Sequence, residues 1–95
     1  MDKTLQNLGL AKRSGKTITG TEKVVEGLRN NKIMLVFLAS DTAYNTTKKI
    51  TDKCLSYNCE LITKYDSLEL TKALGGTNCH VVGIIDRGFA KLLKE

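Results

Sequence analysis

The apolar and polar positions of this 95-residue chain form two alternating kinds of segment. In the first kind, apolar residues recur three or four positions apart, the spacing of one face of an α-helix. This spacing predicts helices at about 3–13, 21–30, 44–57, 66–74 and 87–94. In the second kind, short runs of β-branched and aliphatic residues predict strands at about 17–19, 33–39, 60–64 and 81–85.

The regular alternation of strands and helices predicts an α/β protein. The runs 33–39 and 81–85 are apolar without interruption, as in strands covered on both faces. We therefore expect a three-layer α/β/α sandwich with a parallel or mixed sheet, formed by residues 1–95 as one domain. The Gly20 turn, the Ser40-Asp41 turn and the loop at 76–79 are compatible with one shared end of the sheet, which spacing alone does not decide.

Charge narrows the expected partners. Lys and Arg number 15 against 10 Asp and Glu, which gives a net charge of +5 and a pI of about 9.2. This excess favours a polyanionic partner, which is RNA, DNA or an acidic membrane surface. The chain has neither the apolar run needed to span a bilayer nor a secretory signal at its start, so we expect a cytosolic protein.

The cysteines and the single histidine suggest neither a metal site nor catalysis. Cys54, Cys59 and Cys79 are odd in number and form no Cys-x-x-Cys motif, so we expect reduced, buried thiols. His80 adjoins Cys79, and a zinc site there would need carboxylates to complete it. No spacing unites a nucleophile, a base and an orienting group. We therefore expect no metal, no cofactor and no enzymatic activity.

The stretch 12–23 is the candidate binding region. It crosses from one predicted helix through a short strand to Gly20, where the next helix begins. A helix start exposes unpaired N–H groups and suits a phosphate, and a glycine there lets a ligand come close. The alternative is an ordinary helix start with solvated lysines. The basic residues of the stretch are Lys12, Arg13, Lys16 and Lys23.

Lysines also gather on the third predicted helix, at Lys48, Lys49 and Lys53. A solvated helix surface is the commoner explanation of such a run.

Several segments occur in the order of a known family: Gly9–Lys16, Gly20–Val24, Leu38–Thr42, Asn45–Lys49, Asp52–Cys54 and Leu70–Gly75. Over essentially its whole length the chain resembles the kink-turn-binding ribosomal proteins of the large subunit. It is most similar to their small bacterial relatives of the YlxQ type. The resemblance implies an α/β/α sandwich with a four-stranded mixed sheet and a site for structured RNA.

In that family, the start of the second helix enters the kink of a bent RNA and reads sheared G·A pairs. The loop before the last strand covers a flipped-out base. The resemblance thus implies backbone contacts from Gly20 and Thr21, and a base or phosphate contact from Lys23. The other site residues that it implies are Arg13 and Lys16 on phosphates, Gly76, Thr77 and Asn78 over the extruded nucleotide, and Ser40 and Asp41 nearby.

Two positions depart from the family pattern. Glu22 replaces an asparagine that donates and accepts at a guanine edge, and Glu26 replaces a lysine. A carboxylate can accept from guanine N–H groups but cannot donate. The first hypothesis is a non-catalytic RNA-binding protein whose partners are ribosomal or kink-turn RNA and ribosomal or assembly proteins. The alternative is a protein-interaction subunit that has lost kink-turn recognition.

Overall fold

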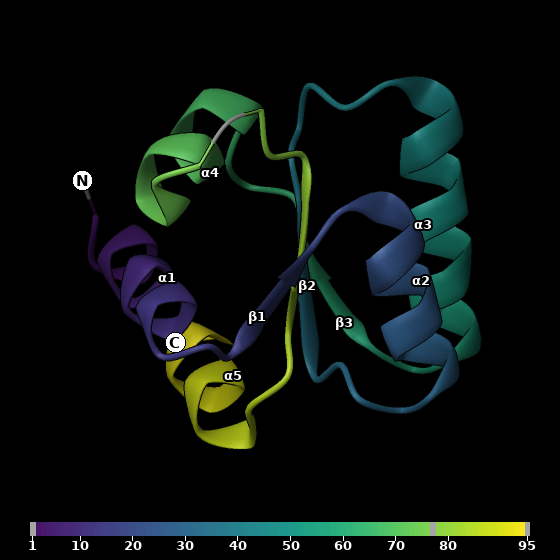
Figure 1. Cartoon of the computed structure of the whole chain (residues 1–95). Coiled ribbons are helices and arrows are strands. Elements are labelled where there is room, and N and C mark those ends of the chain that lie inside the picture. The colour runs from purple at the N-terminus through teal and green to yellow at the C-terminus, as the bar shows by residue number, and fades with distance from the viewer. Residues whose placement is uncertain (1, 77, 95) are drawn as a thin grey trace.

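The computed structural model describes residues 2–76 and 78–94 (Figure 1). Helices and strands alternate along these residues, as the sequence pattern predicts. Their order is α1 (Lys3–Arg13), β1 (Thr17–Thr19), α2 (Thr21–Arg29), β2 (Leu35–Leu38), α3 (Tyr44–Ser56), β3 (Glu60–Ile62), α4 (Ser67–Leu74), β4 (Val81–Ile84) and α5 (Arg87–Lys94). None of these helices is long and apolar enough to cross a membrane.

The four strands form one mixed sheet in the order β1-β4-β2-β3. β4 runs antiparallel to both β1 and β2, and β2 runs parallel to β3. The central strands β2 and β4 are buried along their whole length, which explains why their sequences lack polar alternation. The mixed four-stranded sheet confirms the predicted fold class.

Helices cover both faces of the sheet (Figure 1). α1, α4 and α5 lie on one face, and α2 and α3 lie on the other. Successive side chains of β2 point to opposite faces of the sheet. Phe37 packs against α1, α4 and α5, and Val36 packs against α2 and α3. The result is the expected three-layer α/β/α sandwich.

Local sequence signals account for the ends of α4. The Asp66 carboxylate accepts from the Glu69 N–H at 2.8 Å, and the Glu69 carboxylate accepts from the Asp66 N–H at 3.1 Å. This reciprocal pair is the predicted capping box. Gly75 ends the helix in the left-handed conformation, with φ of 71°.

The polar residues of the turn before α3 do not cap that helix. The N-cap residue of α3 is Ala43, whose side chain cannot accept a hydrogen bond from the helix. Asp41 instead accepts from both the N–H and the hydroxyl of Ser67, at 2.8 and 2.6 Å. The reason is that the turn runs beside the segment entering α4, where the Ser40 N–H donates to the Tyr65 carbonyl at 2.8 Å.

Three turns meet at one end of the sheet. Because β4 is antiparallel to its neighbours, its start lies beside the ends of β1 and β2. The Gly20 N–H donates to the Val81 carbonyl at 3.1 Å, and the Ala39 N–H donates to the His80 carbonyl at 2.8 Å. The Gly20 turn, the turn after β2 and the loop before β4 therefore share this end, a point that the sequence leaves open.

Candidate nucleic-acid interface

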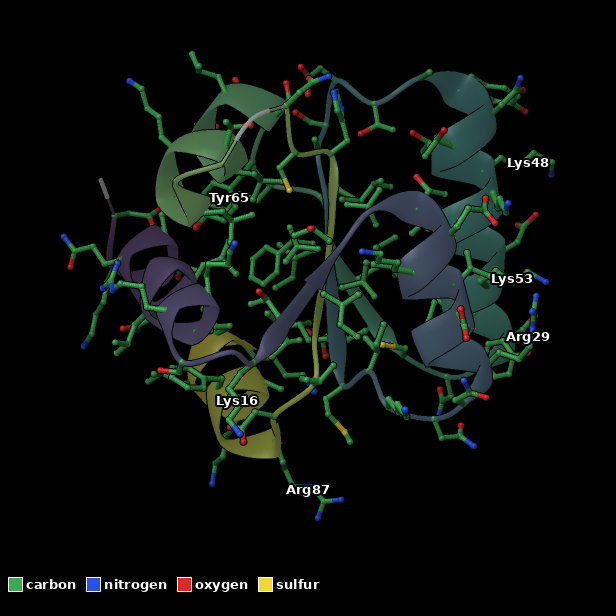
Figure 2. All side chains as sticks on the ribbon, in the orientation of Figure 1. Lys16, Arg29, Lys48, Lys53, Tyr65 and Arg87 are labelled. Atoms are coloured by element: carbon green, nitrogen blue, oxygen red, sulfur yellow. The ribbon has the colours of Figure 1, made fainter. Side chains whose placement is uncertain are left out.

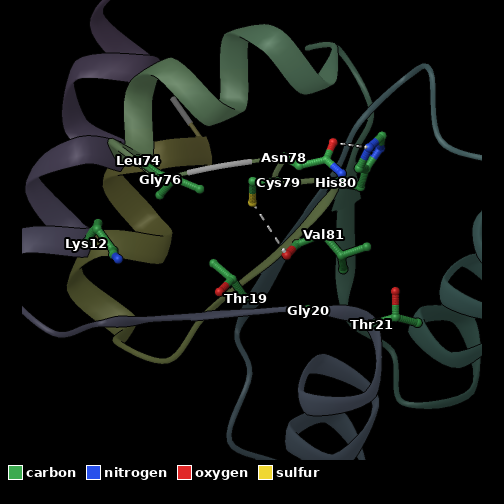
Figure 3. A pocket seen from close by; sticks show the side chains of 10 residues that line it. All are labelled: Lys12, Thr19, Gly20, Thr21, Leu74, Gly76, Asn78, Cys79, His80 and Val81. Atoms are coloured by element: carbon green, nitrogen blue, oxygen red, sulfur yellow. Dashed lines mark hydrogen bonds between the residues drawn. The ribbon is translucent and has the colours of Figure 1, made fainter.

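A hollow of about 460 Å³ lies between the start of α2 and the loop before β4 (Figure 3). Gly20 and Thr21 line it from one side, and Gly76 and Asn78 line it from the other. Lys12 reaches it from α1. Segments more than fifty residues apart in the chain thus form a single concave surface next to a helix start.

Gly20 sets the shape of this surface through its backbone. Its φ of 103° and ψ of 142° lie outside the regions that residues with side chains favour. Its N–H donates to Val81, and its carbonyl accepts the first helical hydrogen bond from Val24 at 3.0 Å. A Cβ at this position would meet no described atom within 4 Å. Conformation rather than lack of space therefore requires glycine here.

The start of α2 presents backbone donors. Gly20 has no side chain with which to cap the helix, whereas Asp2 and Asp66 cap α1 and α4 with their carboxylates. The next three N–H groups, on residues 21–23, precede the first helical bond, which Val24 donates. The helix dipole adds a partial positive charge at this end. This arrangement suits a phosphate.

The loop before β4 is held by side-chain contacts on both sides. The Asn78 side-chain oxygen lies 3.2 Å from His80 Nε2, and His80 Nδ1 lies 3.4 Å from the Thr42 hydroxyl. The Cys79 N–H donates to the Thr71 hydroxyl oxygen at 2.9 Å. Asn78 itself has a positive φ of 46°, which asparagine tolerates better than most residues. The loop's exposed amide is therefore positioned rather than free to rotate away.

Glu22 on α2 forms an ion pair with a lysine on the neighbouring helix α3. Its carboxylate lies 2.7 Å from Lys49 Nζ on α3, and this hydrogen bond and charge lower the pKa of Glu22. The pair is solvent-exposed, so it contributes little to stability. The ion pair matters for electrostatics instead. Glu22 is the acidic residue that replaces the family's asparagine, and the Lys49 ammonium beside it offsets its negative charge.

The Asp41 carboxylate accepts two hydrogen bonds from Ser67. The two hydrogen bonds from Ser67 lower the pKa of its carboxyl group. Asp41 and Ser40 lie at the same end of the sheet as the hollow but do not line it.

The structure brings together only some of the predicted site residues. Gly20, Thr21, Gly76 and Asn78 line the hollow, and Glu22 and Lys23 follow directly along α2. Thr77 lies outside the described residues.

Two predicted phosphate contacts lie elsewhere. The Lys16 carbonyl accepts from the Ile85 N–H at 3.0 Å, at the end of β1 opposite Gly20 (Figure 2). Four steps of extended chain place the two Cα atoms roughly 13 Å apart. Arg13, the last residue of α1, is exposed but does not line the hollow.

Lys12 and His80 also line the hollow, although neither is among the site residues that the family resemblance implies; Lys12 belongs only to the basic stretch 12–23. A signal for Lys12 was present in the sequence, because it follows the buried Leu8 by one helical turn and so shares its face. The sequence suggests His80 only as a zinc ligand or a base, because its hydrogen bond with Asn78 depends on a fold that the sequence does not reveal. Within residues 2–76 and 78–94, no group of three or more His, Cys, Asp or Glu side chains is placed to hold a metal ion.

Comparisons with known proteins agree on one family. The model of the ribosomal protein L7Ae/L30e/S12e/Gadd45 family matches residues 2–94. The chain is 41% identical over 93 residues to the RNA-binding protein YlxQ of Enterococcus faecium, covering 98% of this chain and 89% of that protein. It is 37% identical over 86 residues to the RNA-binding protein YlxQ of Bacillus subtilis, covering 90% of this chain and 86% of that protein.

Solved structures support the same assignment. A protein of unknown function from Bacillus halodurans superposes with a TM-score of 0.96 at 37% identity, over 99% of this chain and 95% of that one. The 15.5kD RNA binding protein of Giardia lamblia superposes with a TM-score of 0.84 over 95% of this chain and 78% of that one. At 13% identity, the second match shows a shared fold alone. These matches confirm the resemblance drawn from the sequence, and the chain belongs to the ribosomal protein L7Ae/L30e/S12e/Gadd45 family.

Proposed function

We propose that this protein is a non-catalytic, cytoplasmic RNA-binding protein that recognises a kink-turn or a similarly bent RNA at the hollow. The observation that carries the proposal is the meeting of the uncapped start of α2 with the loop before β4 around one concave surface. The names of the two YlxQ relatives, both RNA-binding proteins, support the partner class.

The first part of the proposed contact is electrostatic. A phosphate at the start of α2 would accept from the backbone N–H groups of residues 21–23, with Lys23 exposed beside them and Lys12 across the hollow. Arg13 and Lys16 lie outside the hollow, with Lys16 at the opposite end of β1 from Gly20. They would meet phosphates of the flanking strand rather than of the kink.

The second part concerns an unpaired base. The hollow's volume falls in the range of small-ligand pockets, which suits one extruded nucleobase. Gly76 has no side chain to block entry, and the Asn78 amide offers both a donor and an acceptor to a base edge. Thr77 completes the proposed loop contact, while Ser40 and Asp41 would approach the RNA from the neighbouring turn.

Glu22 takes a compatible role in this proposal. A carboxylate accepts hydrogen bonds, and guanine exposes an amino donor on its minor-groove edge. The Lys49 ammonium, 2.7 Å away, offsets the repulsion that Glu22 would exert on phosphates. Kink-turn recognition would therefore use the carboxylate of Glu22, which only accepts hydrogen bonds, where the family has an asparagine amide that both donates and accepts.

The test compares lysines that differ only in position. Lys23→Ala and Lys12→Ala should each weaken RNA binding and reduce the slope of log K against log salt by roughly 1, because each removes about one phosphate contact. Lys91→Ala is the matched control, since it removes the same charge from the exposed surface of α5. Lys16→Ala should have a smaller effect than Lys23→Ala.

Equal losses for all four variants would contradict the proposed site and leave only a generally basic surface. No RNA binding at all, together with a stoichiometric protein partner that survives nuclease treatment, would instead favour the protein-interaction subunit.

A further inference from the structure

Two cysteines meet at the far end of the molecule from the hollow. α3 ends with Tyr57 as its C-cap and with Asn58 in the left-handed conformation, at φ of 54°. The Cys59 N–H donates to the Cys54 carbonyl at 2.8 Å, and the Asn58 N–H donates to the Leu55 carbonyl at 3.3 Å. This hydrogen-bond pair is the Schellman motif.

The motif brings two particular side chains together. In a Schellman motif, the residue after the left-handed position packs against the residue three places before the C-cap. In this chain both of these positions are cysteines, Cys59 and Cys54, and both line the same pocket. Both are free thiols. The backbone therefore brings the two residues to one pocket without any covalent bond, and Cys59 Sγ also lies 3.8 Å from the Ile33 carbonyl oxygen and 3.7 Å from that of Glu60.

The two thiols differ in access. Cys54 is buried, with 2% of its surface exposed, whereas Cys59 is only half-buried, which corrects the expectation that all three thiols are buried. The pocket beside them has a volume of about 360 Å³ and is also lined by Glu60 and Lys94. The Lys94 ammonium lies 3.8 Å from the Glu60 carboxylate, so the two charges beside the pocket largely offset each other. The pocket thus gives a small molecule access to Cys59, which is the more exposed of the two thiols.

We propose that Cys54 and Cys59 form a reversible redox pair, oxidised to an intrachain disulfide by exchange with a small disulfide such as oxidised glutathione. The site is separate from the RNA interface and does not depend on the proposed function. Cys59 is the first thiol to react, and Cys54 is the resolving thiol.

The exchange balances in two steps. The Cys59 thiolate attacks one sulfur of oxidised glutathione, the glutathione disulfide bond breaks, and one glutathione leaves as its thiolate. Cys54 then gives up its proton to solvent and its sulfur attacks Cys59 Sγ, which displaces the second glutathione. The protein loses two electrons and two protons, and one glutathione disulfide becomes two molecules of reduced glutathione.

Acidity supports this order of reaction. The hydrogen bond from Cys54 lowers the pKa of Cys59, and the nearby Lys94 charge acts in the same direction, against the opposing effects of burial and of Glu60. The same hydrogen bond, together with burial, raises the pKa of Cys54. Because the thiolate is the attacking species, Cys59 reacts first.

Cys79 provides an internal contrast. It is buried beside β4, and burial raises the pKa of its thiol. Its Sγ lies 3.9 Å from the Val81 carbonyl oxygen, at the other end of the sheet from the cysteine pair. It should remain reduced under conditions that oxidise the pair.

The test is a glutathione redox titration of the folded protein, with acid quenching, alkylation and peptide mass spectrometry. The wild type should lose two hydrogen atoms in mass and carry a bond between Cys54 and Cys59. Cys54→Ser should stop at a glutathione adduct on Cys59, and Cys59→Ser should give neither product. Cys79→Ser should behave as the wild type does.

Circular dichroism establishes that each variant is folded, and urea-unfolded wild type supplies the reference in which all three thiols are accessible. A folded wild type that keeps glutathione on Cys59 without forming the internal bond would overturn the proposal. Oxidation of Cys79 in preference to the pair would also overturn it.

Discussion

Replacing Gly20 with alanine tests the geometry at the start of α2. The native φ of 103° with ψ of 142° belongs to a region that is used almost solely by glycine, and holding another residue there costs about 1–3 kcal/mol. Alanine also restricts the unfolded chain, which offsets about 0.4–1 kcal/mol of that cost. We expect Gly20→Ala to lower the free energy of unfolding by about 1–2 kcal/mol.

The chain has two possible responses to this strain. If the backbone keeps its conformation, the full strain appears in the stability. If the backbone relaxes, the 3.1 Å bond from the residue 20 N–H to Val81 is lost, which costs about 0.5–1.5 kcal/mol. Both responses lower the stability by similar amounts, so the expected result does not depend on which one occurs.

Thermal unfolding followed by circular dichroism measures the effect. For a domain of this size, 1 kcal/mol shifts Tm by about 4–8 °C, so we expect a decrease of about 4–16 °C. Gly76→Ala is the control, because Gly76 lies across the same hollow, has no positive φ and has room for a Cβ. Its stability should stay within about 0.5 kcal/mol of the wild type. Equal Tm values for the two variants would refute the conformational argument.

Three further predictions concern packing, charge and pH. Gly9→Ala should destabilise the protein by about 1–3 kcal/mol in urea unfolding, although alanine favours helices, because the new Cβ would lie 2.7 Å from a backbone oxygen of α4. Glu22→Gln should leave RNA binding at low salt nearly unchanged in a filter-binding assay, because Lys49 already offsets the charge of Glu22 and glutamine keeps an acceptor oxygen; markedly tighter binding would contradict that offset. Tyr65→Phe removes a 2.9 Å hydrogen bond to the Asp2 carboxylate and should cost about 1 kcal/mol. Burial and that bond raise the pKa of Tyr65, so its contribution to stability is complete below about pH 10 and is lost as pH rises further; wild type should lose more stability than Tyr65→Phe there.

The positions of the helices and strands were readable from the sequence, because each element carries its own local signal. Helical spacing placed α1 and α5, and the uninterrupted apolar runs placed the two central strands. The Asp66–Glu69 box and Gly75 fixed both ends of α4. Strand ends were less readable: Ile33 and Ala39 lie outside β2, since only residues 35–38 form its ladder.

The site was only partly predictable, because it depends on contacts between distant elements. Gly20 was identifiable from its position at a strand-to-helix junction. Helical spacing from Leu8 favoured Lys12, but the position of Lys16 was not readable, since the three residues of β1 separate it from Gly20 and leave it at the opposite end of the sheet. The pairing of Glu22 with Lys49 depends on how two helices lie together, and no spacing within either helix reveals it.

The most direct test of kink-turn recognition is a gel-shift titration of the wild-type protein at low and physiological salt. One RNA is a standard kink-turn, and the other is identical except that it lacks the sheared G·A pairs. We predict tight binding to the first RNA and much weaker binding to the second at both salt concentrations. Equal, salt-sensitive binding to both RNAs would contradict recognition at the hollow and would show that only a basic surface binds.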